Sequence, residues 1–256
     1  QNINNKYLEN NMNNLLEIFK KKLESDNPVF GPFMKTGDPA FVEIAGYAGF
    51  DFVVLDMEHG PTSFENLQNL VRAALVGGAF PVVRCSDKND ISIGRALDVG
   101  ALGVQVPQVT TAKEARSVIK AARFYPEGER GVCAYVRAAD YSSIPSKKYF
   151  QDANQCLAIL QLEGSEAIKN IDEILEVKGI DLIFLGPFDL SQSLGYPGET
   201  DHPEVVAAMK KIVEKSYAKG ILTGTFTNSF ESVQRWKDAG VKYISYSVDT
   251  GILTDA

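Results

Sequence analysis

Eight short apolar runs alternate with segments of helical periodicity, and this rhythm constrains the fold more than any other feature of the chain. Apolar runs of this length, bounded by turn residues, are typical of buried strands. Their alternation with helices indicates parallel βαβ units, and eight such units predict an α/β protein of the closed (β/α)₈ (TIM) barrel type. The predicted strands are residues 29–34, 52–56, 80–85, 103–109, 157–163, 181–186, 220–226 and 241–247.

The alternative architecture is an open, doubly wound sheet, which usually has fewer strands and a glycine-rich first turn. The sequence contains neither GxGxxG nor GxxxxGK[ST], so nucleotide binding finds no support. We predict a single barrel domain over residues 13–256, beginning with an N-terminal helix. Residues 1–12 are polar and rich in Asn, and are expected to be a disordered leader or a segment added for expression. Residues 124–155 break the rhythm and are predicted to be an insertion after the helix at 112–122.

Composition narrows the class of partner. The formal net charge of −7 argues against a nucleic-acid partner and against binding to an anionic membrane surface. No apolar run approaches the roughly 20 residues that a membrane span needs. Cys85, Cys133 and Cys156 are widely spaced and form no CxxC motif, so we expect reduced, small core residues of a cytoplasmic protein.

Two of the apolar runs end in a carboxylate, Glu163 and Asp189, and catalytic groups of a barrel lie at the carboxyl ends of its strands. Strand alternation puts Gln161 on the same face as Glu163. The pair is suited to a divalent cation with oxygen ligands, Mg²⁺ or Mn²⁺. Each residue also has a structural interpretation: Asp189 with Gln192 fits a helix capping box, and Glu163 fits an exposed loop.

A second polar group follows the strands at 52–56 and 80–85. His59, three residues after Asp56, suits proton transfer, although for this residue taken alone a structural histidine bonded to Asp56 or to backbone is the favoured interpretation. Glu58 is a further carboxylate that suits an ion pair. Arg84 ends an otherwise apolar strand, so its guanidinium must face an anion. That anion could be a carboxylate or enolate oxygen of the substrate, or it could be Asp56 or Glu58 in an internal salt bridge. The two interpretations are compatible.

Three further features bear on the chemistry. The segment Gly186-Pro187-Phe188-Asp189 opens a short helix whose free N–H groups suit a small carboxylate, unless it is a plain strand-to-helix turn. Arg130 in the insertion reaches over the barrel mouth or, as we favour, is a surface charge. We find no lysine that ends a strand in a position for a Schiff base, which disfavours a covalent, class I route.

With these residues in hand, the chain resembles the HpcH/HpaI aldolase family, the class II pyruvate aldolases. The resemblance extends from about Leu15 to Leu253. It depends on four stretches, Phe52–Pro61, Val82–Arg84, Arg95–Pro107, and Gln161–Glu163 taken with Gly186–Ser191. Gly60 and Phe188 depart from the family pattern, which has alanine and a small residue at these two positions.

The resemblance implies a (β/α)₈ barrel with Glu163 and Asp189 as ligands of Mg²⁺ or Mn²⁺, with Co²⁺ a further option. It implies that Arg84 and Gln161 hold pyruvate and its enolate, and that Asp56 and His59 transfer protons. Backbone around Gly186, Pro187 and Phe188 would bind the pyruvate carboxylate. It also implies a homo-oligomer, usually a hexamer built as a trimer of dimers with an exchanged C-terminal helix.

The function that we expect is reversible cleavage of a 4-hydroxy-2-oxo acid to pyruvate and an aldehyde. Two alternatives stay open. One is a different lyase with a metal-stabilised enolate, acting on a CoA thioester or decarboxylating oxaloacetate. The other is a barrel that binds a keto acid without catalysis.

Overall fold

The computed structural model describes residues 5–256 and contains a closed barrel of eight parallel strands in sequence order. Each strand pairs with its neighbours in the sequence, and β8 pairs with β1 to close the ring. The predicted (β/α)₈ barrel is therefore confirmed. The strands are β1 (Val29–Met34), β2 (Phe52–Asp56), β3 (Phe80–Arg84), β4 (Gly103–Val106), β5 (Leu157–Leu162), β6 (Leu182–Leu185), β7 (Leu222–Thr227) and β8 (Tyr243–Val248).

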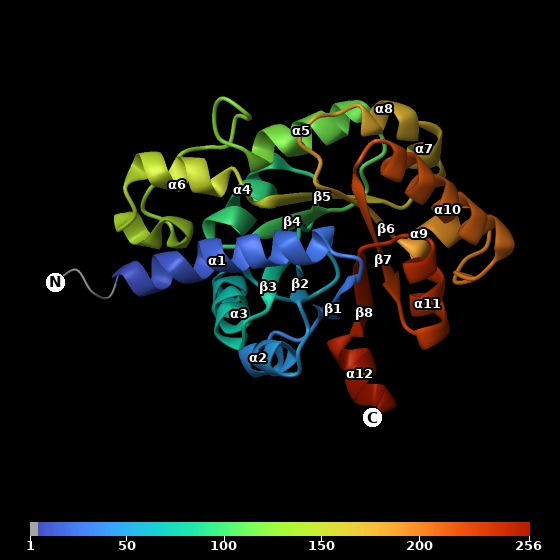
Figure 1. Cartoon of the computed structure of the whole chain (residues 1–256), viewed down its shortest axis with the longest axis horizontal. Coiled ribbons are helices and arrows are strands. Elements are labelled where there is room, and N and C mark those ends of the chain that lie inside the picture. The colour runs from blue at the N-terminus through green and yellow to red at the C-terminus, as the bar shows by residue number, and fades with distance from the viewer. Residues whose placement is uncertain (1–4) are drawn as a thin grey trace.

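The helices surround the barrel (Figure 1). The predicted helix at 166–176 is two short helices, because the backbone leaves the helical region at Asn170. Two more short helices, α9 and α12, follow β6 and β8. The helices are α1 (Asn5–Glu24), α2 (Pro39–Tyr47), α3 (Phe64–Gly77), α4 (Asp90–Asp98), α5 (Ala112–Ala122), α6 (Ser146–Ala153), α7 (Ser165–Lys169), α8 (Ile171–Leu175), α9 (Pro187–Ser193), α10 (Pro203–Ala218), α11 (Phe230–Asp238) and α12 (Asp249–Asp255).

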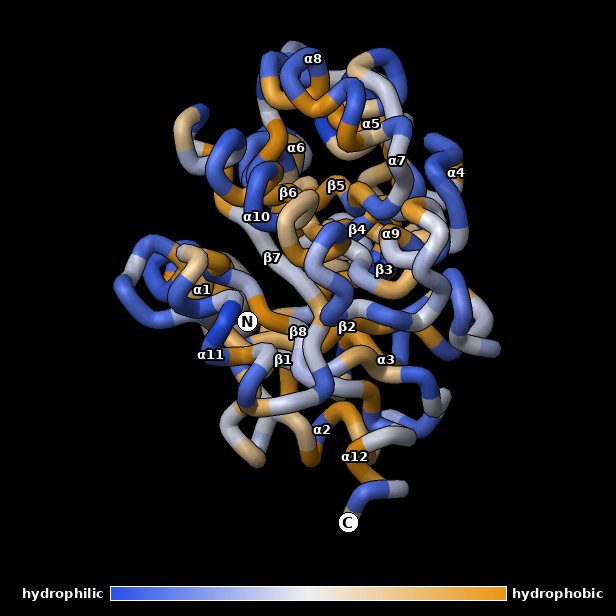
Figure 2. Tube along the Cα trace, turned by 90° about the vertical axis from the view of Figure 1, so that its right-hand side faces the viewer, coloured by the Kyte–Doolittle hydropathy of each residue, from blue (hydrophilic) through white to orange (hydrophobic). Residues whose placement is uncertain are grey.

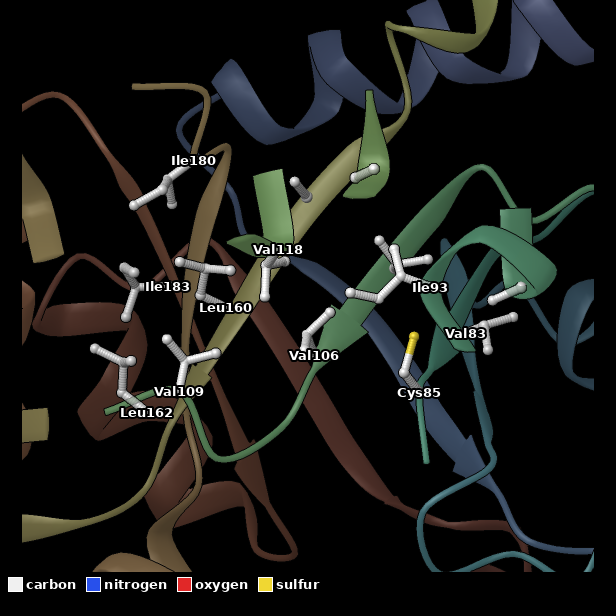
Figure 3. Close-up of a cluster of buried hydrophobic side chains, with 14 of the residues drawn as sticks. Val83, Cys85, Ile93, Val106, Val109, Val118, Leu160, Leu162, Ile180 and Ile183 are labelled. Carbon is white, nitrogen blue, oxygen red and sulfur yellow. The ribbon is translucent and has the colours of Figure 1, made fainter. Parts of the chain in front are cut away.

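The main hydrophobic core lies between the barrel and the outer helices. Val83, Val106 and Leu160 of the strands pack in one buried cluster with Ile93 of α4 and Val118 of α5 (Figure 3). Strands buried on both faces read as near-continuous apolar runs, and this is why the sequence revealed them. The outer helices expose only one side to water, so apolar and polar segments alternate along α5 and α8 in Figure 2.

A second core fills the barrel interior and its amino end. Phe52, Phe80 and Tyr243 are fully buried there, and the Phe52 and Tyr243 rings stack at 3.9 Å. Helix α1 covers this end, because Phe19 stacks on Phe80 with 4.1 Å between ring centroids. The amino end is therefore sealed, and only the carboxyl ends of the strands are left for a site.

The insertion at 124–155 forms a compact unit containing a 3₁₀ helix, η1 (Arg137–Ser142), and α6. Our preference for Arg130 as a surface charge was wrong. Its side chain is buried, pairs with Asp98 at 2.6 Å, and lies over the Phe124 ring at 4.5 Å. A guanidinium can be buried when a carboxylate and an aromatic face both compensate its charge.

Other expectations concern the N-terminus, the cysteines and membranes. Residues 1–4 of the predicted leader lie outside the described residues, and α1 begins at Asn5. Cys85 and Cys156 are buried as expected, whereas Cys133 is exposed in the insertion. None of the helices in the described part of the chain combines the length and the apolar character that crossing a membrane requires.

Candidate active site

A cavity of about 370 Å³ opens at the carboxyl ends of the strands, and most of the predicted site residues line it. A larger hollow of about 760 Å³ lies between α1, α3 and the insertion, but it contains none of those residues. The strand-end cavity is therefore the candidate site. The predicted residues on its wall are His59, Arg84, Gln161, Gly186, Pro187, Phe188 and Asp189.

Arg84 and Asp56 form a buried ion pair beside this cavity. The two residues are direct partners in the β2–β3 register, and Arg84 donates from Nε to Oδ1 at 2.8 Å and from Nη2 to Oδ2 at 2.7 Å. Nη1 of Arg84 lies 3.0 Å from Oε2 of Glu58. The predicted internal ion pair is present, and it holds the guanidinium at the cavity wall.

Lys35 corrects one sequence-based prediction. It is the first residue after β1, it lines the cavity, and its Nζ lies 2.5 Å from Oδ2 of Asp56. A lysine therefore does end a strand in the site. An ammonium group held against a carboxylate is not a free nucleophile, so this geometry still disfavours a Schiff base.

Asp249, at the start of α12, fixes the loop that carries Lys35. Its carboxylate is buried and accepts hydrogen bonds from the backbone N–H of Lys35 at 2.9 Å and of Thr36 at 2.8 Å. The Thr36 hydroxyl donates to the same carboxylate at 2.6 Å. Side-chain hydrogen bonds thus join the ends of β8 and β1 in addition to the strand pairing, and they hold the backbone of Lys35 in place.

The surroundings of Asp56 determine its charge. Burial raises the pKa of this carboxyl, but hydrogen bonds and charge from Arg84 and Lys35 outweigh burial and bring the pKa down to about 2. Asp56 also accepts backbone hydrogen bonds from Glu58 at 3.1 Å and His59 at 3.3 Å. Asp56 is therefore ionised, and hydrogen bonds from its neighbours occupy both of its carboxylate oxygens.

His59 is connected to Asp56 through its backbone. Among the contacts that the structure describes, no hydrogen bond joins the His59 imidazole to Asp56. The ring is 61% exposed, and its Nε2 lies 3.9 Å from Oε2 of Glu58. The imidazole therefore faces the cavity beside a carboxylate, where it can accept or release a proton.

Glu163 is buried just beyond β5. Its Oε1 accepts the backbone N–H of Gln108 at 2.8 Å, and its Oε2 accepts the amide of Gln161. Gln105 in turn donates to Gln161 at 2.6 Å, so the amide is oriented. Burial first, then the charges of Glu58 and Asp189, raise the pKa of Glu163 to about 7. The suggested exposed loop position for Glu163 was wrong.

Asp189 lies in the first turn of α9 and is exposed to the cavity. The capping-box interpretation was wrong as well: α9 begins at Pro187, so its N-cap is Gly186, and no side chain caps it. A Cβ atom at position 186 would lie 2.7 Å from Oε2 of Glu163. Gly186 therefore lets the start of α9 approach the buried carboxylate closely.

These carboxylates suit a divalent cation. Burial is the main reason that the pKa of Glu163 is raised, and the like charges of Glu58 and Asp189 add to it, so a bound cation would offset both effects. Within the described residues no group of three His, Cys, Asp or Glu side chains is arranged as a complete cage. Mg²⁺ and Mn²⁺ commonly take one or two carboxylates and complete their shell with water and substrate oxygens. Glu163 and Asp189 fit that pattern.

Comparison with known proteins identifies the family of this chain. The family model "HpcH/HpaI aldolase/citrate lyase" matches residues 30–256. A hydroxypyruvate/pyruvate aldolase of Roseobacter denitrificans is 35% identical over 239 residues, 93% of each chain. A 2-keto-3-deoxy-L-rhamnonate aldolase of Escherichia coli K12 is 36% identical over 248 residues, covering 96% of this chain and 92% of that one.

Among solved structures, an HpcH/HpaI aldolase/citrate lyase family protein from Burkholderia cenocepacia superposes with a TM-score of 0.88. It is 29% identical, and the match covers 93% of this chain and 95% of the other. The resemblance inferred from the strand-end motifs is confirmed. The chain belongs to the HpcH/HpaI aldolase/citrate lyase family.

Proposed function

We propose that this protein cleaves 4-hydroxy-2-oxo acids reversibly to pyruvate and an aldehyde, with a divalent cation held by Glu163 and Asp189. The family and its aldolase-named relatives make the chain a carbon–carbon lyase of the class II aldolase type. One observation carries the finer proposal. A fixed guanidinium, Arg84, lines the same cavity as Asp189 and Gln161, and Gln161 donates to the buried Glu163.

A cation bound by the two carboxylates would supply Lewis-acid stabilisation of the enolate of pyruvate. Arg84 provides a second positive group at the developing oxyanion. It needs no reorganisation during the reaction, because Asp56 and Glu58 already hold its guanidinium. Preorganised donors of this kind are worth about 3 kcal/mol in the transition state. Gln161, oriented by Gln105, adds a polar contact to the keto acid.

His59 is the proposed base that removes the proton of the 4-hydroxyl group. Asp56 cannot share that role, because Arg84, Lys35 and two backbone N–H groups occupy its oxygens. Its proposed task is to fix the loop that carries the imidazole. The exposed ring faces the cavity, and Glu58 beside it would stabilise the imidazolium that forms.

The resemblance also supports finer proposals about cofactor and assembly. We propose Mg²⁺ or Mn²⁺ as the cation, with Co²⁺ as a substitute, and a cytoplasmic homo-oligomer, a hexamer built as a trimer of dimers. The molar mass of the protein in solution, measured by light scattering, tests the assembly. A monomer would contradict it.

Pyruvate release, followed with lactate dehydrogenase and NADH, tests the reaction. Protein loaded with Mg²⁺ or Mn²⁺ should release pyruvate from a 4-hydroxy-2-oxo acid and lose this activity in EDTA. Full activity in EDTA would remove the metal from the proposal. Release from oxaloacetate or a CoA thioester alone would favour the other lyases. Pyruvate binding without exchange of its methyl protons in D₂O would indicate a binding protein.

A further inference from the structure

Four phenylalanine rings form a continuous wall on one side of the active-site cavity. The Phe188 ring lies 5.8 Å from that of Phe226, Phe226 lies 6.0 Å from Phe33, and Phe33 lies 6.1 Å from Phe184. These centroid distances are within the range of favourable aromatic pairs, so each ring supports the next. We call Phe33, Phe184, Phe188 and Phe226 the aromatic wall.

The aromatic wall begins beside the groups proposed to bind pyruvate and leads away from them. Phe184 and Phe188 belong to β6 and to the helix α9 that follows it, and the Arg84 guanidinium lies over the Phe33 ring at 4.7 Å. Arg84 ends β3, Gln161 lies on β5, and Asp189 follows β6. Phe226 lies on β7 and Phe33 on β1, and Val248 of β8 lines the cavity between them. The sector from β7 to β1 contains none of the groups assigned to pyruvate or to the cation. It is the space left for the second reactant.

This sector contains few side chains that could form a hydrogen bond with a hydroxyl group of the substrate. Of its lining residues in the described part of the chain, only Lys35 has a polar side chain, and its Nζ already donates to Asp56. Phe188 is 48% exposed, a large apolar surface for a residue beside a metal ligand. A polyhydroxylated aldehyde would lose its hydrogen bonds to water here without replacing them. The alkyl chain of an apolar aldehyde forms no hydrogen bonds with water, and it would cover the exposed Phe188 ring.

We propose that the aromatic wall receives the aldehyde and makes the enzyme selective for apolar aldehydes over hydroxylated ones of the same length. The inference depends on the proposed aldolase function and names the substrate class of its second reactant. Phe226 and Phe33 determine this specificity, and Phe188 extends the surface toward the mouth of the cavity.

The test uses propanal and glyceraldehyde, which both have three carbons, each condensed with pyruvate by the Mn²⁺-loaded protein. We compare the ratio of kcat/KM for the two aldehydes between variants, so that their intrinsic reactivities cancel. Phe226→Ala and Phe188→Ala should each lower the propanal-to-glyceraldehyde ratio by roughly tenfold, mainly through a higher KM for propanal. Phe226→Leu, which keeps an apolar side chain, should retain most of the ratio.

Phe230→Ala is the matched control, because this exposed ring packs on Tyr246 outside the cavity. Its ratio should equal that of the unmodified protein. Exchange of pyruvate methyl protons in D₂O separates the two proposals, since it requires no aldehyde. If exchange and condensation occur but the ratio is the same in Phe226→Ala, Phe188→Ala and the unmodified protein, the inference about the wall is overturned. If neither exchange nor condensation occurs, the aldolase proposal fails first.

Discussion

Arg84 donates two parallel hydrogen bonds to Asp56 across the β2–β3 pair, from Nε at 2.8 Å and from Nη2 at 2.7 Å. A bidentate pair of this kind fixes both the position and the plane of the guanidinium. The Asp56 side chain is fully buried, so its negative charge depends on Arg84 and Lys35. The ion pair thus fixes the Arg84 guanidinium at the cavity wall and is a source of pH-dependent stability.

Asp56→Asn should make the free energy of unfolding depend less steeply on pH in the acid range. The folded-state pKa of about 2 lies below the ordinary value of 3.8, so Asp56 stabilises the fold fully above pH 4. This contribution, on the order of 2 kcal/mol, is lost as the pH falls from about 4 to 2. Urea unfolding between pH 5 and 3 should show a shallower decline in Asp56→Asn, from a lower starting stability. Identical slopes would contradict the ion-pair account.

Arg84→Lys should fold and lose catalysis. A lysine keeps the charge but cannot donate in parallel to Asp56, so its ammonium group would not be held at the same point. We expect kcat to fall by about 100-fold, in line with the loss of about 3 kcal/mol from a preorganised donor. Circular dichroism should be unchanged. Arg72→Lys, a substitution on the outer helix α3, is the control. A normal rate in Arg84→Lys would refute the role proposed for the guanidinium group of Arg84.

Protons should compete with the cation at Glu163. Because the pKa of this carboxyl is raised to about 7, the site holds a proton there below neutral pH, and metal binding must displace it. Mn²⁺ affinity, measured by electron paramagnetic resonance, should weaken up to about tenfold per pH unit below pH 7. Glu163→Gln should bind Mn²⁺ weakly and with a much flatter pH dependence. A steep dependence retained in that variant would assign the proton elsewhere.

Lys35 should not form a covalent adduct with pyruvate. Its Nζ is held by Asp56, and its backbone is fixed by Asp249. Treatment with pyruvate and borohydride, followed by mass spectrometry, should leave the intact mass unchanged. Lys35→Met should weaken catalysis, because it removes one of the two cations that keep Asp56 ionised. A reduced adduct on Lys35 would instead indicate a class I route.

The sequence revealed the barrel because buried parallel strands carry a local signal, and it revealed Glu163, Asp189 and Arg84 because charges at the ends of apolar runs are conspicuous. It also named Asp56 and Glu58 as possible partners of Arg84, but it could not reveal the full set of contacts between these charges. That Arg84 and Lys35 both hold Asp56, while His59 reaches it only through backbone, depends on β1, β2 and β3 lying side by side. Arg130 was misassigned for the same reason, since Asp98 is distant in sequence.

Gly186 offers the sharpest test of the link between α9 and the proposed metal site. A Cβ atom here would lie 2.7 Å from Oε2 and 3.0 Å from Cβ of Glu163, so Gly186→Ala must displace that side chain. The closest atom is the end of a side chain and the Cβ contact needs only a small shift, so we expect the barrel to remain folded while Mn²⁺ affinity falls at least tenfold.

Gly94→Ala is the matched control for that substitution, because nothing lies within 4 Å of its added Cβ inside α4. It should leave Mn²⁺ binding unchanged and raise the free energy of unfolding by up to about 1 kcal/mol, the usual gain for this change inside a helix. If Gly186→Ala bound Mn²⁺ as tightly as Gly94→Ala, Glu163 would not be the ligand, and the cation would have to sit elsewhere in the cavity.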